Sequence, residues 1–155
     1  MRTVVSGDRK AHLSAMTAML TYPGVPSIFA GDEIGLEGSW GEDSRRTINW
    51  EDRSGWDHDF LAEAKKLIEL RRTQDGLIEG GLRWVAVEDN FICYLRESEK
   101  QSVLVFISRK AVRTEIDLAD YGYKVSKTLY GPEATGGSIK IDADGATQGI
   151  WEVKS

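Results

Sequence analysis

The spacing of apolar residues changes near Asp75, from a helical period before it to an alternating period after it. Before Asp75 the pattern predicts one helix over residues 9–20, apolar around most of its circumference, and an amphipathic helix that ends near Arg72. Asp8 is the expected N-cap of the first helix, and Asp57 or Asp59 that of the second. Between them, the short apolar run 25–30 is bounded by turn residues and predicts a buried strand of a parallel sheet.

After Asp75 the alternating pattern predicts an all-β domain. The candidate strands cover residues 82–87, 91–96, 103–108, 114–118, 125–130, 138–141 and 150–153. Short strands at this spacing favour an antiparallel sandwich with Greek-key connections. We therefore expect two units, residues 1–74 and residues 75–155, with Trp84 and Trp151 in the core of the second.

The first unit is incomplete by this interpretation. Its single buried-type strand has no sheet of its own, so residues 1–74 are expected to be part of a larger parallel α/β domain. The loop from Gly31 to Asp57 is longer than compact domains usually contain without a functional reason.

Composition narrows the possible partners. The net charge of -5 and the lack of clustered Lys and Arg argue against nucleic acid, whereas a neutral sugar is compatible with this charge. The sequence contains no apolar run long enough to span a membrane and no secretory signal at its start, so no membrane partner is expected. The single cysteine, Cys93, excludes an internal disulfide and favours a cytoplasmic location as a buried thiol. His12 and His58 are isolated, so we expect no metal and no cofactor.

The most informative stretch is Tyr22-Pro-Gly-Val-Pro-Ser-Ile-Phe-Ala-Gly-Asp-Glu-Ile-Gly-Leu36, followed by Asp43-Ser-Arg-Arg-Thr-Ile-Asn-Trp50. It resembles the eighth barrel strand of the α-amylase superfamily, with its Pro-Gly-x-Pro-x-Ile-Tyr-Tyr-Gly-Asp-Glu-Ile-Gly pattern and the following Asn-Arg-Arg-x-Pro-Met-x-Trp pattern. The likeness continues into the helix that ends in Leu-Ile-Glu-Leu-Arg-Arg72. Two departures are Ala30, where the superfamily has a second aromatic residue, and Thr47-Ile48, where it has Pro-Met.

The resemblance implies an α+β fold class. The chain would comprise the end of a (β/α)8 barrel (helix, strand, long loop, helix) followed by an all-β antiparallel Greek-key sandwich. Residues at the C-terminal end of a barrel strand point into the mouth where substrates bind.

Five residues of this region are candidates for substrate binding. Asp32 and Glu33 either face sugar hydroxyls or are held by Arg45 and Arg46, whose planar guanidinium groups can bind carboxylates through two hydrogen bonds. One of these arginines could equally shape a sugar subsite. Trp40 lies in the same loop as Trp50 and Trp56, and these rings either stack on a pyranose or form the core of the loop.

No catalytic residue is assigned. Retaining glycoside hydrolysis needs a nucleophilic carboxylate and an acid/base carboxylic acid. In the superfamily these follow the fourth and fifth barrel strands, and a third carboxylate belongs to an Asn-His-Asp motif after the seventh. None of these motifs occurs in the chain, and residues 2–8 resemble the segment just after Asn-His-Asp. The isolated chain is therefore expected to hydrolyse nothing.

By this resemblance the chain is part of a retaining glycoside hydrolase that acts on α-glucosidic bonds of starch-derived or related oligosaccharides. It would supply the barrel-closing unit and a stabilising β domain. One alternative is a carbohydrate-binding module that uses exposed tyrosines among Tyr94, Tyr121, Tyr123 and Tyr130; another is part of a transglycosylase or sugar isomerase. Self-association of the chain is also expected, because the lone strand and the apolar helix would leave unpaired edges and apolar surface.

Overall fold

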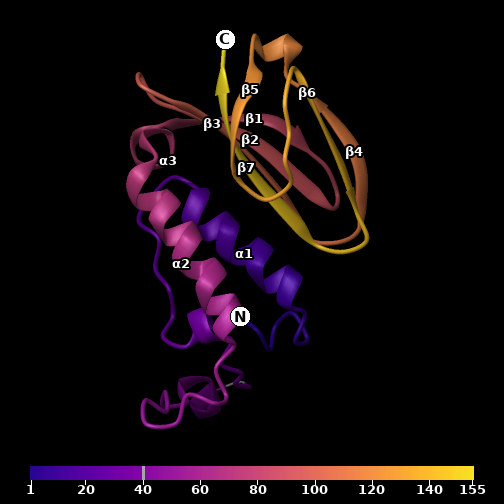
Figure 1. The fold of residues 1–155 in the computed structure, drawn as a ribbon. Coiled ribbons are helices and arrows are strands. Elements are labelled where there is room, and N and C mark those ends of the chain that lie inside the picture. Colours follow the sequence, from indigo (N-terminus) through magenta and orange to yellow (C-terminus); the bar gives the residue numbers. More distant parts are fainter. Residues whose placement is uncertain (40) are drawn as a thin grey trace.

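The computed structural model describes residues 1–39 and 41–155, and its helices lie together at one side of a β-sandwich (Figure 1). Helices α1 (Arg9–Thr21) and α2 (His58–Thr73) confirm both predicted helices, and a short helix α3 (Asp75–Glu79) follows α2. The Asp8 carboxylate accepts hydrogen bonds from the N–H groups of Lys10 and Ala11, as the N-cap prediction requires. Of the two candidates for the second cap, Asp57 is correct, since its carboxylate accepts a hydrogen bond from the N–H of Phe60 at 3.0 Å.

All predicted strands of the β domain are confirmed within a few residues at each end. They are β1 (Gly81–Val87), β2 (Phe91–Glu97), β3 (Ser102–Ser108), β4 (Val112–Asp117), β5 (Lys124–Tyr130), β6 (Ser138–Ala143) and β7 (Thr147–Lys154). Antiparallel pairing joins five of them in the order β1-β2-β3-β7-β5, and β4 pairs with β6 in a second sheet. The last strand thus lies between β3 and β5. The Greek-key description of these connections stays a prediction.

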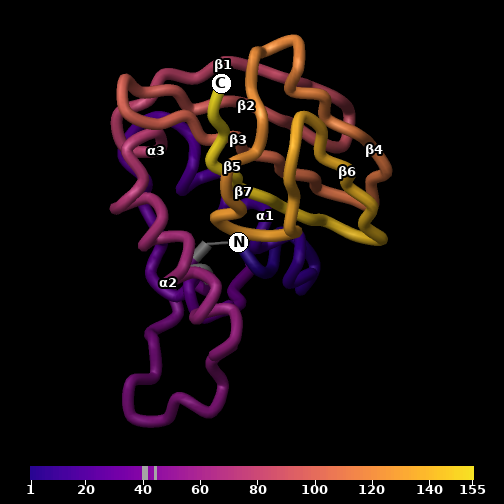
Figure 2. The backbone as a smooth tube through the Cα atoms, turned by 45° about the horizontal axis from the view of Figure 1, so that its top comes forward, coloured from indigo at the N-terminus to yellow at the C-terminus, as the bar shows by residue number. Residues whose placement is uncertain are grey.

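The five-stranded sheet is covered on both faces, which gives three layers (Figures 1 and 2). One face carries Tyr94, Val103, Val105, Ile107 and Ile150, which pack against Met16, Leu20, Phe60, Ala64 and Leu67 of α1 and α2. The opposite face carries Cys93, Leu95, Leu104, Phe106, Trp151 and Val153, which pack against Ile116, Ile139 and Ile141 of the second sheet. Successive strand residues alternate between the two clusters, as the pleat of a strand demands.

The helices and the sheet are also joined by buried polar contacts. The Arg96 guanidinium of β2 donates from Nε and Nη2 to the carbonyl of Gly80, after α3, and from Nη1 to that of Thr21, at the end of α1. The hydroxyls of Tyr94 and Thr21 lie 2.6 Å apart. Since residues on both sides of position 75 share one apolar cluster, the division into units 1–74 and 75–155 stays a prediction.

Two expectations about apolar residues are wrong. Residues 25–30 form no strand, and Val25 is 97% exposed, because none of the described segments lies alongside to accept and donate backbone hydrogen bonds. Trp84 is 44% exposed rather than part of the core, because β1 is an edge strand of the five-stranded sheet. Trp151 lies on β7, between β3 and β5 in the same sheet, and is fully buried as predicted.

Candidate functional site

A cleft of about 520 Å³ lies where the start of the chain meets the loop after residue 28. Its lining residues are Met1, Thr3, Val4, Phe29, Ala30, Gly31, Asp32, Leu36, Glu37, Gly38 and Ser39. The floor depends on the sharp turn at Gly31, whose φ is +99° and where an added Cβ would lie 2.8 Å from Leu36 Cδ2. Only glycine fits both this backbone conformation and this close approach.

Asp32 and Glu33 occupy different environments, although they are adjacent in sequence. Asp32 lines the cleft, and its Oδ1 accepts a hydrogen bond from the amine of Met1 at 2.6 Å. Glu33 folds back on its own turn, where Oε2 accepts a hydrogen bond from the N–H of Gly31 at 2.9 Å. Only Asp32 of this predicted pair is therefore placed at the cleft.

Of the two alternatives for Asp32 and Glu33, the one in which Arg45 and Arg46 hold them is wrong. Arg46 instead donates hydrogen bonds from Nε and Nη2 to the Asp43 carboxylate at 2.7 and 2.9 Å. Arg45 forms an ion pair with Glu42, with 3.8 Å between Arg45 Nη1 and Glu42 Oε2. Both arginines lie in or just after a 3₁₀ turn (Gly41–Arg45), where carboxylates three residues earlier are within reach.

Arg46 nevertheless has an indirect connection to the cleft. The carboxylate of Asp43 also accepts hydrogen bonds from the N–H and hydroxyl of Ser39, which lines the cleft. The hydrogen bonds from Arg46 and Ser39 hold the pKa of Asp43 well below its usual range. The predicted Trp40 lies outside the described residues.

The other tryptophans of the loop contact each other rather than line the cleft. The rings of Trp50 and Trp56 meet edge to face with centroids 5.4 Å apart, and the Arg53 guanidinium lies 5.0 Å from the centre of the Trp56 ring. This arrangement supports loop packing as the role of Trp56.

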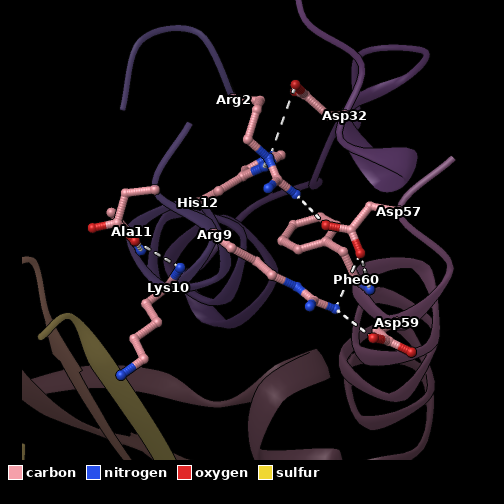
Figure 3. Close-up of polar contacts among 10 residues, drawn as sticks. Arg2, Arg9, Lys10, Ala11, His12, Asp32, Asp57, Asp59 and Phe60 are labelled. Atoms are coloured by element: carbon pink, nitrogen blue, oxygen red, sulfur yellow. Dashed lines mark hydrogen bonds and ion pairs between the residues drawn. The ribbon is translucent and has the colours of Figure 1, made fainter. Parts of the chain in front are cut away.

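A charged cluster connects with the cleft residue Asp32 (Figure 3). The Arg2 side chain enters the interior and donates from Nε to His12 Nδ1 at 3.2 Å and from Nη2 to Asp57 Oδ2 at 2.8 Å. Its guanidinium lies 5.0 Å from the centre of the Phe60 ring. At Gly35, an added Cβ would lie 2.7 Å from Arg2 Nη2. Arg2 is thus enclosed by α1, by the start of α2 and by the loop.

Asp57 and His12 have shifted pKa values in this cluster. Partial burial acts to raise the pKa of Asp57, but hydrogen bonds from the N–H of Phe60 and from Arg2 lower it overall, with a further contribution from Arg9, 3.0 Å away. Burial, and secondly the charge of Arg2, lower the pKa of His12 from 6.5 to about 4, although Asp32 and Asp57 act in the opposite direction. His12 is therefore neutral at physiological pH.

This cluster is not evident from the sequence. Arg2 and Asp57 are distant in sequence, and the isolated position of His12 argues only against a zinc site. The one available signal was a histidine on a helix that is otherwise apolar around most of its circumference.

The composition of the cleft suits a neutral, hydroxyl-bearing ligand. Phe29, Val4 and Leu36 offer apolar surface, while polar side chains such as Asp32 and Thr3 can exchange hydrogen bonds with hydroxyls. Within residues 1–39 and 41–155, no group of three or more His, Cys, Asp or Glu side chains is arranged to hold a metal ion. No described helix is long and apolar enough to cross a bilayer.

Solved structures with this arrangement are enzymes of the α-amylase type. The debranching enzyme of Nostoc punctiforme in its native form matches 98% of the chain with a TM-score of 0.82 at 25% identity, over 33% of its own length. Isomaltulose synthase of Klebsiella sp. LX3 matches 99% of the chain with a TM-score of 0.78 at 14% identity, over 40% of its length, which shows a shared fold.

Curated relatives give the same result at the level of sequence. A cyclomaltodextrinase of Bacillus sp. is 32% identical over 108 residues, or 68% of this chain and 19% of that protein. An intracellular maltogenic amylase of Bacillus subtilis is 30% identical over 116 residues, or 73% of this chain and 20% of that protein. No protein-family model matches the chain. The chain belongs to the α-amylase superfamily and corresponds to the C-terminal portion of its enzymes. It spans about a fifth of the length of the curated relatives that it matches.

Proposed function

We propose that the chain is the barrel-closing part and stabilising β domain of a retaining glycoside hydrolase that acts on α-glucosidic bonds of starch-derived oligosaccharides. The observation that carries the proposal is the 32% identity with a cyclomaltodextrinase over 108 residues. The cleft supports it, because its mixture of apolar and hydroxyl-binding side chains suits a sugar.

In this proposal the chain binds and positions substrate but does not cleave it. The two carboxylic groups of the double-displacement mechanism come from residues outside this chain. Asp32 at the cleft accepts hydrogen bonds from sugar hydroxyls, and Phe29 supplies an aromatic surface. Arg46 acts through Asp43 to hold Ser39 at the edge of the cleft.

In this proposal the β domain stabilises the helices next to the cleft. Its five-stranded sheet buries the apolar faces of α1 and α2, and Arg2 is held by His12 of α1 and by Asp57, the N-cap of α2. Without this sheet the helices would expose Met16, Leu20 and Leu67 to water, which would weaken their packing against each other.

A hybrid enzyme tests the proposal. The matching C-terminal portion of the Bacillus cyclomaltodextrinase is replaced by this chain, and sugar release from a cyclomaltodextrin is measured. We expect activity in the hybrid, and none in the truncated enzyme or in the 155-residue chain alone. Within the hybrid, Asp32→Asn should lower the activity, whereas Asp142→Asn, in an exposed pair with Arg113 on the second sheet, is the matched control. A folded hybrid without activity, or a hydrolytically active isolated chain, contradicts the proposal.

The alternative of a carbohydrate-binding module receives less support. Tyr94 is buried, and the hydroxyls of Tyr121, Tyr123 and Tyr130 donate hydrogen bonds to Val85, Glu97 and Glu63 respectively. The Arg83 guanidinium also lies over the rings of Tyr121 and Tyr123, 5.3 and 6.0 Å from their centres, so one face of each ring already has a partner. Titration of the isolated chain with maltoheptaose, followed by tryptophan fluorescence, would reveal such a module by saturable binding. Product analysis of the hybrid separates hydrolysis from transglycosylation and isomerisation.

Two other expectations stay predictions. Self-association of the chain can be measured by sedimentation of the purified protein. A cytoplasmic location of the whole protein can be measured by cell fractionation.

A further inference from the structure

His12 lies between the two segments that line the cleft, although it does not line the cleft itself. The first wall is the segment 1–4, of which Met1, Thr3 and Val4 line the cleft. The second wall is the segment 29–39, of which residues 29–32 and 36–39 line it. His12 lies on α1, is 1% exposed, and stacks on the Phe60 ring with centroids 4.3 Å apart. One ring nitrogen faces Arg2 of the first wall and the other faces Asp32 of the second (Figure 3).

The contact with Arg2 determines where the proton of His12 resides. A guanidinium Nε–H can only donate, so Nδ1 of His12, 3.2 Å away, must be the acceptor and carry no proton. A neutral imidazole with a bare Nδ1 carries its proton on Nε2. The Nε2–H therefore points toward the Asp32 side of the ring.

Nε2 is the unusual atom of this cluster. It is buried and has no hydrogen-bond partner among the residues that the structure describes, and Asp32 Oδ1 lies 4.0 Å away. Buried polar atoms without partners are rare, and those that occur often belong to functional sites. A small movement of Asp32 would bring the carboxylate within hydrogen-bond distance of Nε2–H.

We propose that His12 is a positioning residue of the cleft, which holds Arg2 through Nδ1 and directs Nε2–H toward the Asp32 carboxylate, and thereby fixes the two walls relative to each other. The identity of the ligand in the cleft rests on the proposed function, whereas the positioning itself does not. The groups that face His12 are Arg2 and the amine of Met1 from the first wall, Asp32 from the second, and Asp57 at the start of α2.

A hydrogen bond between the walls provides a reporter for this role. The N–H of Gly38, in the second wall, donates to Thr3 Oγ1, in the first wall, at 2.9 Å. If His12 fixes the walls, loss of its nitrogens should free the Gly38 N–H. If His12 merely packs on Phe60, a phenylalanine at the same position should leave this hydrogen bond intact.

The first experiment is nitrogen NMR of the isotope-labelled 155-residue chain. The chain contains only two histidines, so a His58→Gln variant assigns the signals. At neutral pH we expect a protonated Nε2 and a bare Nδ1 for His12. On acidification the Gly38 amide signal should shift with the same midpoint as the His12 ring. A proton on Nδ1, or a Gly38 signal that does not follow His12, overturns the proposal.

The second experiment compares hydrogen exchange of the Gly38 amide in three variants. His12→Phe keeps an aromatic ring on Phe60. It should raise the exchange rate of the Gly38 amide by about tenfold or more, relative to any change in the exchange rates of the β3 amides. Met16→Ala is the matched control, because Met16 is a buried residue of the same helix that faces the sheet rather than the cleft. If Met16→Ala speeds Gly38 exchange as much as His12→Phe does, the effect is one of stability alone and the proposal is wrong.

His12→Asn keeps the test decisive if His12→Phe does not fold. Its carbonyl can still accept the hydrogen bond from Arg2, but it has no titratable ring. It also lacks the Nε2–H that faces Asp32. We therefore expect Gly38 protection between that of the parent chain and that of His12→Phe, and loss of the pH-dependent shift; persistence of that shift refutes the proposal. These measurements need no catalysis. A positive NMR result with an inactive hybrid would therefore overturn the proposed function and leave the positioning role of His12 standing.

Discussion

Replacement of Arg96 by methionine should strongly destabilise the chain. The Arg96 side chain is 1% exposed, and its guanidinium satisfies the carbonyls of Thr21 and Gly80, one at the C-terminal end of α1 and one directly after α3. Helix C-termini carry a partial negative charge, so a cation there is favourable. No carboxylate among the described residues forms an ion pair with Arg96, and burial lowers the pKa of this arginine.

Two opposing effects determine the magnitude of the change. Methionine retains apolar bulk but leaves two buried carbonyls without donors, at a cost of about 2–6 kcal/mol together. Removal of the buried charge recovers part of its desolvation penalty. We expect Arg96→Met to lower the free energy of unfolding by about 3 kcal/mol, a large part of the stability of an ordinary domain.

Urea denaturation of the parent chain and the variant measures this difference from the two midpoints. Arg83→Met, on the neighbouring strand, is the matched control, because the Arg83 side chain is 46% exposed and pairs with Glu97 at the surface. This control should change the free energy of unfolding by less than about 1 kcal/mol. If Arg96→Met is no less stable than Arg83→Met, the carbonyls of Thr21 and Gly80 do not depend on Arg96 and the reasoning is wrong.

Three further predictions concern other buried groups. The pKa of His12 is about 4 in the folded chain, against 6.5 for an unperturbed histidine. As the pH falls, His12 therefore becomes protonated in the unfolded chain before it does in the folded chain. The free energy of unfolding should therefore decrease by about 3 kcal/mol between these pH values, and urea denaturation of His12→Phe across the range should show a flatter profile. Asp57→Ala removes both an N-cap and the carboxylate partner of Arg2. In the same assay it should lower the free energy of unfolding by more than the roughly 1 kcal/mol expected for Asp8→Ala. Equal losses in the two variants would contradict a role for the Arg2 contact. Burial raises the pKa of the Cys93 thiol to about 12, so a thiol reagent should modify it only in urea, and rapid modification of the folded chain would contradict its burial.

The candidate site shows which parts of a loop can be predicted from sequence. Asp32 lines the cleft, although the barrel strand expected before it does not form, and its role in substrate binding stays a prediction. Its expected partners Arg45 and Arg46 were wrong, because carboxylates three residues away in sequence reach an arginine before more distant ones do. Arg2 and His12 could not be predicted, because their contact depends on how the first residues of the chain fold over α1.

The sequence by itself determined helices α1 and α2 and the seven strands of the β domain. The period of apolar positions is a local property, and the backbone translates a period of 3.6 or 2 directly into a helix or a strand with one buried face. Asp8 was likewise predictable as a cap, because a cap contacts only the next few residues.

Only the tertiary structure decided which apolar residues are covered and which charges meet. Trp84 has the same alternating pattern as its neighbours but is exposed, because its strand lies at the edge of the sheet. Residues 25–30 have the composition of a buried strand, yet a strand needs a partner for its backbone hydrogen bonds, and no described segment provides one. The buried positions of Arg96 and His12 depend on segments far apart in sequence, and no local pattern contains that information.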